Sequence, residues 1–279
     1  MKKRNWTTIP LILILLIGLS LLLYPPFSNY WNSQRQTKAI ANYTNFVANM
    51  NEEDFSPIWE SAYEYNESLV PRSNQYLLTE DQESRYNQEL NVTGSGMIGF
   101  IEIPSIDVDL PIYHGTDETV LQVAVGHVEW SSLPTGGEST HCVFSGHRGL
   151  PSAKLFSDLD KLAVGDYFII NVLDQVLTYE VDQIRIVEPQ ETEDLLIQEG
   201  KDLCTLVTCT PYGVNTHRIL VRGHRVANLE EAQVVRVTAD AMIVEKLVVV
   251  PFILAPILLV MLIFLLAGTG KKRNRRKEK

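Results

Sequence analysis

The chain has 279 residues, of which 45% are hydrophobic, and a formal net charge of −10. That length allows one large domain or two small ones. Because basic tails near the two ends contribute +3 and +6, the rest of the chain carries −19. Such an acidic body argues against nucleic acid as a partner.

The first apolar segment runs from Trp6 to Tyr24 without a charged residue. As a helix it would be about 28 Å long, close to the roughly 30 Å of a bilayer core. We therefore predict a cytoplasmic tail at 1–5 and a transmembrane signal-anchor at 6–24. The alternative is a cleaved signal peptide, but the following YPPFSNYWNSQ offers no clear small-x-small cleavage site.

A second uncharged segment, residues 247–267, would reach about 31 Å as a helix. Pro251 and Pro256 lie inside it, and membrane helices tolerate proline. A basic tail follows at 268–279. Since basic flanks of membrane segments stay in the cytoplasm, we expect both termini inside and the intervening domain outside. The sequence thus predicts a multi-pass protein of the cell membrane, with lipid as a partner.

Between the anchors, residues 25–96 are polar and carry apolar side chains at helical spacing. We predict one or two amphipathic helices, then a flexible stretch at 69–82 (LVPRSNQYLLTEDQ) and a turn at 93–96 (TGSG). A linker helix is expected at 229–246. The helical periodicity is clearest at Ile40, Tyr43, Phe46, Val47 and Met50.

From residue 97 the hydrophobic period changes to two. Short β-branched segments separated by Gly, Pro or Asp are typical of a closed or sandwiched antiparallel sheet. We predict a mainly β domain at 97–228, interrupted by short helices at DETVLQVAVG, SAKLFSDLDKL and TEDLLIQEG. The predicted strands are MIGFIEIP, VDLPIY, HCVFSGH, GDYFIINV, VLTYEVDQIRIVE, DLCTLVTC and RILVRGHRV.

The chain has three cysteines, Cys142, Cys204 and Cys209, which form no CxxC pair and no disulfide framework. No His or Cys pair has a usual zinc spacing, so no metal site is expected. Since side chains alternate along a strand, DLCTLVTC places Cys204 and Cys209 on opposite faces. Cys142 and Cys204 lie within apolar strands, which favours packed, inert thiols. Cys209 ends its strand beside a turn, where a substrate can reach it.

A thiol nucleophile requires a proton acceptor and a donor for the developing oxyanion. Among six histidines, His147 follows a strand and opens the loop HRGLPS. Arg218 begins the strand that returns from Cys209, and a guanidinium can donate without losing its proton. The alternatives are a surface or core histidine and an arginine in a surface ion pair.

These segments resemble the sortases. TLVTC at 205–209 matches their TLxTC signature, SGHRG at 145–149 carries their histidine, and Arg218 lies nine residues after Cys209, where their arginine falls. The resemblance is to class C, pilin-polymerising sortases of Gram-positive bacteria. It covers about residues 97–226 in detail and includes IPSIDVDLPIYHGTDE, GHVEWSSLPTGGESTH, SGHRGLPSAKLFSDLDKLAVGD and TLVTCTPYGVNTHRILVRG.

The resemblance implies a closed sortase-type β-barrel with a membrane helix at each end and no cofactor. Cys209 would attack the Thr–Gly bond of an LPxTG-like sorting signal, with His147 as general acid and base and Arg218 holding the substrate. A lysine of the next pilin subunit would then release the acyl group, which builds pili. The alternative within the family is a housekeeping sortase that anchors surface proteins to cell-wall peptide.

The sequence departs from class C in the lid, which usually carries an Asp-Pro-aromatic motif. Here Val70, Pro71 and Arg72 stand at that place, so the acidic residue and the aromatic residue are both missing. We therefore predict that the segment does not cover Cys209.

Two other classes of protein compete with a sortase. A papain-like hydrolase would carry its cysteine on a helix, whereas TLVTC is a strand pattern. In a membrane-anchored adhesin, Cys209 would be no more reactive than the other cysteines.

Overall fold

The computed structural model describes residues 8–69, 77–228 and 260. All the described strands lie in one compact unit of the chain, within Trp31–Arg236. Several predicted segments fall outside the described residues, apart from residue 260. They are the tails at 1–5 and 268–279, the linker helix at 229–246, the second membrane segment at 247–267 and the lid-like residues 70–72.

Helix α1 spans Thr8–Ala48 and contains Pro25 and Pro26. Within the described part of the chain, one helix is long and apolar enough to cross a membrane, and it lies at Ile12–Ala48 with a mean hydropathy of 1.8 in its most apolar window. Residues 8–24 of the predicted anchor therefore form the first part of a longer helix.

The predicted amphipathic segment forms the end of α1, where Ile40 and Tyr43 are buried and Phe46 is exposed. The Tyr43 hydroxyl donates to the Ile98 carbonyl at 2.7 Å and accepts from the Leu173 amide at 2.9 Å. This part of α1 is therefore fixed to two separate segments of the barrel, because a buried hydroxyl needs hydrogen-bond partners.

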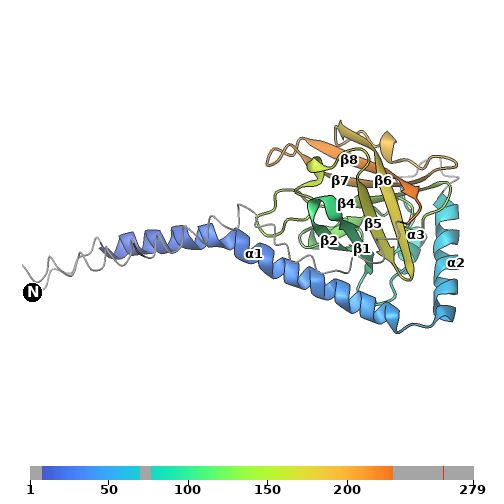
Figure 1. Ribbon diagram of the computed structural model, residues 1–279, viewed down its shortest axis with the longest axis horizontal. Helices are drawn as coiled ribbons and strands as arrows, with labels where there is room; N and C mark the ends of the chain where they lie inside the picture. Colours follow the sequence, from blue (N-terminus) through green and yellow to red (C-terminus); the bar gives the residue numbers. More distant parts are fainter. Residues whose placement is uncertain (1–7, 70–76, 229–259, 261–279) are drawn as a thin grey trace, which may run out of the picture. The chain divides into compact units, whose positions relative to one another are not determined.

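Helix α2, Glu52–Leu69, lies beside the barrel (Figure 1). The Asn66 amide nitrogen donates to the Leu133 carbonyl at 3.1 Å, and the Asn66 oxygen accepts from the Leu133 amide at 2.8 Å. Together with the apolar side chains, this pair of bonds fixes α2 to the loop before β4. The buried face of α2 consists of Phe55, Trp59, Ala62, Tyr65, Asn66 and Leu69.

Helix α3 spans Glu80–Tyr86 and begins with a capping box between Thr79 and Gln82. The prediction of a flexible stretch at 69–82 is therefore wrong for its last residues. The capping box stabilises a helix start by pairing two backbone amides that would otherwise lack partners.

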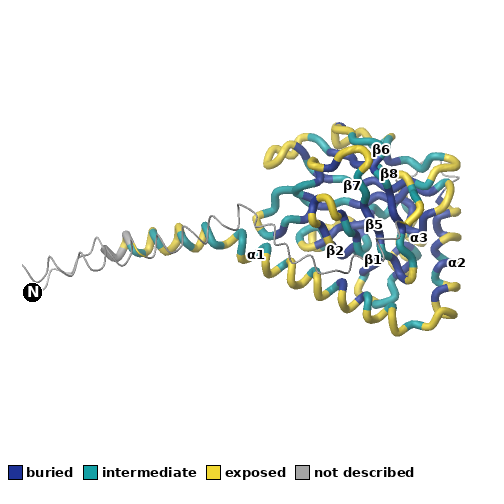
Figure 2. Tube along the Cα trace, viewed as in Figure 1, coloured by how far each residue is buried: buried dark blue, intermediate teal, exposed yellow. Residues whose placement is uncertain are grey.

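Eight strands form a closed barrel in the order β1-β2-β3-β4-β7-β8-β6-β5, which confirms a mainly β fold (Figure 1). Buried positions concentrate in these strands (Figure 2). The strands are β1 Met97–Ile103, β2 Val108–His114, β3 Val125–His127, β4 Thr140–Ser145, β5 Tyr167–Val172, β6 Gln175–Val187, β7 Asp202–Thr210 and β8 His217–Val226.

The barrel is not purely antiparallel, contrary to the prediction, because β2 pairs with β3 and β4 pairs with β7 in parallel. Parallel neighbours require a crossover, and the chain between β4 and β7 contains β5 and β6. The alternation of side chains along a strand is the same in both kinds of pairing, so it does not reveal which one a strand adopts.

The helices inserted between strands are shorter than predicted. Helix α4 covers Glu118–Leu121, and the predicted helix DETVLQVAVG ends there because Val125 begins β3. SAKLFSDLDKL and TEDLLIQEG each contain a single 3₁₀ turn, at Leu159–Lys161 and Glu193–Leu195. A further 3₁₀ turn, Pro104–Ile106, connects β1 to β2.

Candidate active site

The alternation of side chains along β7 separates the two cysteines of this strand. Cys204 and Leu206 are fully buried in the main core, whereas Val207 packs in a second apolar cluster on the other side of the sheet. Cys209 shares the face of Val207 and is partly exposed. The strand pattern therefore predicted correctly which thiol solvent can reach.

Cys142 and Cys204 lie opposite each other in the parallel pair of β4 and β7. All three cysteines are free, and these two are buried. Burial raises the pKa of the Cys142 thiol well above its usual value, and a contact with Cys204 raises it further. Because the thiolate is the nucleophilic form, the buried Cys142 is poorly suited to reaction.

Arg218 lies directly opposite Cys209 in the antiparallel pair of β7 and β8. Residues directly opposite each other project from the same face of a sheet, so the side chains of Arg218 and Cys209 lie on the same face of the barrel wall. Arg218 Nη1 donates to the carbonyls of His217 and Asn215 at 3.1 and 3.3 Å. Among the described residues these are its hydrogen-bond partners, so the guanidinium is not neutralised by a carboxylate.

His147 follows β4, whose last residue, Ser145, pairs with Val207. Gly146 continues the connection, because its amide donates to the Val207 carbonyl at 3.1 Å and its carbonyl accepts from Thr208 Oγ1 at 2.6 Å. The parallel register therefore brings the chain at His147 alongside the end of β7, where Cys209 lies.

Gly146 is required for this arrangement, since a Cβ atom at that position would lie 2.7 Å from the Phe156 ring.

His147 Nε2 is 3.6 Å from Glu118 Oε2, and the side chain of His147 is 28% exposed. The Glu118 side chain is 72% exposed, so solvent strongly screens the electrostatic part of this contact. Glu118 was not predicted from the sequence, because it carries no motif and meets His147 only through the fold.

An apolar cluster continues from Cys209 and Arg218 along the same face of β7 and β8. Val207 and Leu220 are the next same-face pair on β7 and β8. The buried members of this cluster are Val143, Val187, Leu195 and Leu220, with Val128, Trp130 and Val207 packed against them.

Two of the other histidines are buried within hydrogen-bond networks. His127 bonds to the Tyr86 hydroxyl at 3.0 Å and the Ser132 carbonyl at 2.8 Å, and burial lowers its pKa to about 3. His141 bonds to Thr205 Oγ1 at 2.7 Å, and burial lowers its pKa to about 4. These two rings are therefore neutral structural elements near pH 7.

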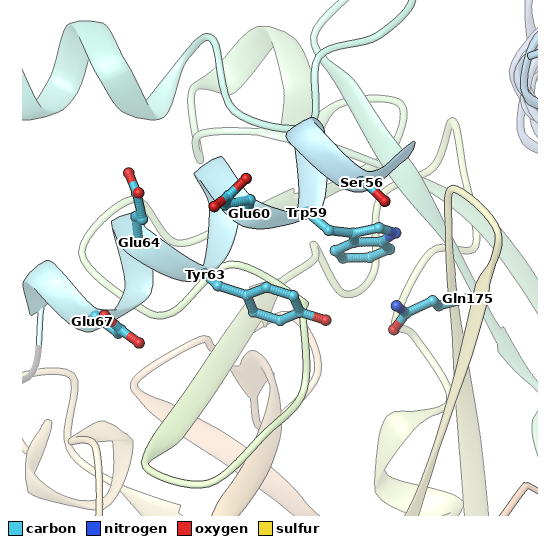
Figure 3. A pocket seen from close by; sticks show the side chains of 7 residues that line it. All are labelled: Ser56, Trp59, Glu60, Tyr63, Glu64, Glu67 and Gln175. Atoms are coloured by element: carbon cyan, nitrogen blue, oxygen red, sulfur yellow. The ribbon is translucent and has the colours of Figure 1, made fainter. Parts of the chain in front are cut away.

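A surface hollow of about 430 Å³ lies over α2 and contains none of the three candidate catalytic residues (Figure 3). The rings of Trp59 and Tyr63 stack there with centroids 5.9 Å apart. Its remaining lining is Ser56, Glu60, Glu64, Glu67 and Gln175. Within the part of the chain that the structure describes, no group of His, Cys, Asp or Glu has an arrangement that could hold a metal ion.

A partly exposed thiol at a strand end, an imidazole after the parallel neighbour and a guanidinium on the antiparallel neighbour define a candidate site for cysteine acyl transfer. Comparisons with known proteins agree with this class. The Sortase domain family matches residues 101–226. The chain belongs to the sortase family of cysteine transpeptidases.

The solved relatives place the chain among the class C sortases. Sortase C1 of Streptococcus agalactiae is 53% identical, with a TM-score of 0.67 over 69% of this chain and 100% of that chain. A Streptococcus pneumoniae sortase C is 43% identical, with a TM-score of 0.60 over 68% of this chain and 97% of that one. Sortase D of Bacillus subtilis is 34% identical over an aligned region that covers 46% of this chain and 63% of that protein's length.

Proposed function

We propose that this protein is a membrane-anchored transpeptidase that cleaves an LPxTG-like sorting signal between Thr and Gly and transfers the acyl group to a lysine of a pilin subunit. The observation that carries the proposal is the placement of Cys209 opposite Arg218, beside the loop that begins at His147. Nucleophile, proton carrier and oxyanion donor thus come from three adjacent segments.

In the first half-reaction, Cys209 attacks as the thiolate, its proton having passed to His147. Its sulfur bonds to the carbonyl carbon of the Thr–Gly bond, and the π electrons of that carbonyl move to its oxygen. Arg218 donates hydrogen bonds to this oxyanion. When the intermediate collapses, the C–N bond breaks, and His147 gives its proton to the leaving glycine amine. The product is a thioester on Cys209.

In the second half-reaction, a lysine amine attacks the thioester carbon, and His147 accepts the proton that the amine loses. The C–S bond breaks and Cys209 leaves as the thiolate. The acyl group and the lysine are then joined by an isopeptide bond, and the enzyme returns to its initial state. His147 therefore acts as acid and then as base, which requires one ring beside the amine that leaves and then beside the amine that attacks.

Two observations support the pilin and the membrane as partners. The crystal structure of the related sortase C of Streptococcus pneumoniae gave insight into the pilin substrate specificity of that enzyme. The apolar part of α1 has the length and composition of a membrane anchor, with the basic residues Lys2, Lys3 and Arg4 before it. A tethered enzyme would meet substrates that are held at the same outer surface of the membrane.

The test uses the full chain in detergent micelles with an LPxTG-type peptide and two acceptors, a lysine-containing pilin peptide and a cell-wall peptide with a free amine. We expect mass spectrometry to show cleavage after Thr and transfer to the lysine, and neither with Cys209→Ala. Transfer only to the wall peptide would favour the housekeeping alternative. Cleavage by Cys209→Ala would exclude the proposed chemistry.

A further inference from the structure

Arg148 directly follows His147, and its side chain is only 8% exposed, which is unusual for an arginine on a loop. Nη1 donates to Thr210 Oγ1 at 3.2 Å, and Nη2 donates to Asp160 Oδ2. Thr210 is the residue after Cys209. One guanidinium therefore connects the segment of His147 to the segment of Cys209.

Tyr212 strengthens the same connection. The Arg148 Cζ atom lies 6.0 Å from the centroid of the Tyr212 ring, within the range of a cation–π contact. The ring also packs on Gly149, where an added Cβ would lie 3.0 Å from it, and Gly149 has a φ of +77°. The backbone at Gly149 thus leaves room for Tyr212, and a larger residue there would be strained.

The contacts of Arg148 lie just beyond the end of the pairing between β4 and β7. The paired register of β4 with β7 ends at Ser145 and Val207, so His147 and Cys209 lie beyond the last residue pair that joins these two strands. Arg148 and Thr210 are each one residue further. Their hydrogen bond holds the two segments together where the sheet no longer does.

The charge of Arg148 is already neutralised, because Asp160 accepts from its guanidinium. Arg218, by contrast, bonds only to carbonyls among the described residues. The two arginines near Cys209 therefore differ in what they can do. Arg218 has a charge free for an oxyanion, whereas Arg148 is committed to the protein.

We propose that Arg148 is a positioning residue that fixes His147 relative to Cys209 by bridging Thr210 and Asp160. This inference rests on the proposed function, in which His147 and Cys209 exchange protons with the substrate. Small displacements of a catalytic group reduce the rate of the chemical step while substrate binding is retained. The expected signature is a loss in kcat with little change in KM.

The test compares Arg148→Met, which keeps an unbranched apolar stem and removes the donors, with Thr210→Val and Asp160→Asn in the full chain in micelles. We expect kcat for peptide cleavage to fall about 10- to 100-fold in Arg148→Met, with KM within about threefold of the parent value. Thr210→Val and Asp160→Asn should lose less, and adding Thr210→Val to Arg148→Met should cost little more, because both remove the same bond.

The control is Arg222→Met. Arg222 is another partly buried arginine, bonded to Asp182 at 2.9 and 3.0 Å, and it contacts neither His147 nor Cys209. This variant should lose stability and keep kcat within about threefold of the parent value. Equal losses of kcat in both arginine variants, or a change confined to KM, would show that Arg148 is merely structural.

A second readout needs no sorting signal. The pH profile of Cys209 alkylation reports the coupling of the thiol to His147. We expect the profile of Arg148→Met to shift toward that of His147→Ala, while Arg222→Met keeps the parent profile. An unchanged profile in Arg148→Met would overturn the inference even if the parent enzyme proved inactive on the peptide, an outcome that would count separately against the proposed function.

Discussion

Cys209 and Arg218 lie directly opposite each other at the ends of β7 and β8, and the pair projects from the same face as Val207 and Leu220. A thiol thus lies at the end of an apolar cluster beside a guanidinium that has no carboxylate partner in the described part of the chain. Because opposite residues in an antiparallel pair have neighbouring Cβ atoms, β pairing itself sets their separation.

Only Cys209 should react with a thiol reagent in the folded protein. Cys142 and Cys204 are 3% and 0% exposed, whereas Cys209 is partly exposed. We expect iodoacetamide followed by peptide mapping to label Cys209 and to abolish cleavage. Cys142→Ala and Cys204→Ala should keep the activity, and equal labelling of all three thiols before unfolding would contradict this assignment.

Replacing Arg218 by lysine should reduce turnover although the charge is kept. Lysine lacks the planar fork that can contact two acceptors at once. If the guanidinium binds the oxyanion, the loss should be about 100- to 1000-fold, as for other single-donor removals. The measurement is a peptide-cleavage rate, with the fold checked by circular dichroism, and activity close to that of the parent would make Arg218 a surface residue.

Stability should decrease as the pH falls below about 6.5, the usual pKa of a histidine in an unfolded chain. Burial lowers the pKa of His127 to about 3 and that of His141 to about 4. Between these values and about 6.5 the unfolded chain binds more protons than the folded protein, so acid favours unfolding. Each histidine contributes up to about 1.4 kcal/mol per pH unit in that window.

Thermal unfolding at a series of pH values measures this slope. His141→Gln should flatten the dependence between pH 6.5 and about 4, where His141 titrates in the unfolded chain only. His224→Gln is the control, because His224 is exposed on β8. Equal slopes for the parent and His141→Gln would refute the prediction.

Both termini should lie on the cytoplasmic side of the membrane, because basic residues flank the two apolar segments at their outer ends in the sequence. The measurement places a single cysteine at residue 3 or residue 275 of a cysteine-free variant. Labelling by an impermeant maleimide should require permeabilised protoplasts. Labelling of either tail on intact protoplasts would contradict the predicted orientation.

The sequence by itself determined the β character of residues 97–228 and the outward orientation of Cys209. Both follow from local rules, since alternation of side chains requires only neighbouring residues. The same rules located Arg218 at the start of the returning strand. They did not distinguish parallel from antiparallel pairing, because a strand carries the same alternation in either.

Only the tertiary structure decided which distant groups surround the candidate residues. Glu118 meets His147 across 3.6 Å, and Arg148 meets Thr210 although the two are separated by 62 positions in the chain. Such contacts depend on crossovers and on the register of β4 with β7, which no local pattern encodes. The strand order of the closed barrel, set by packing of the whole core, therefore decides how the nucleophile and the histidine are held together.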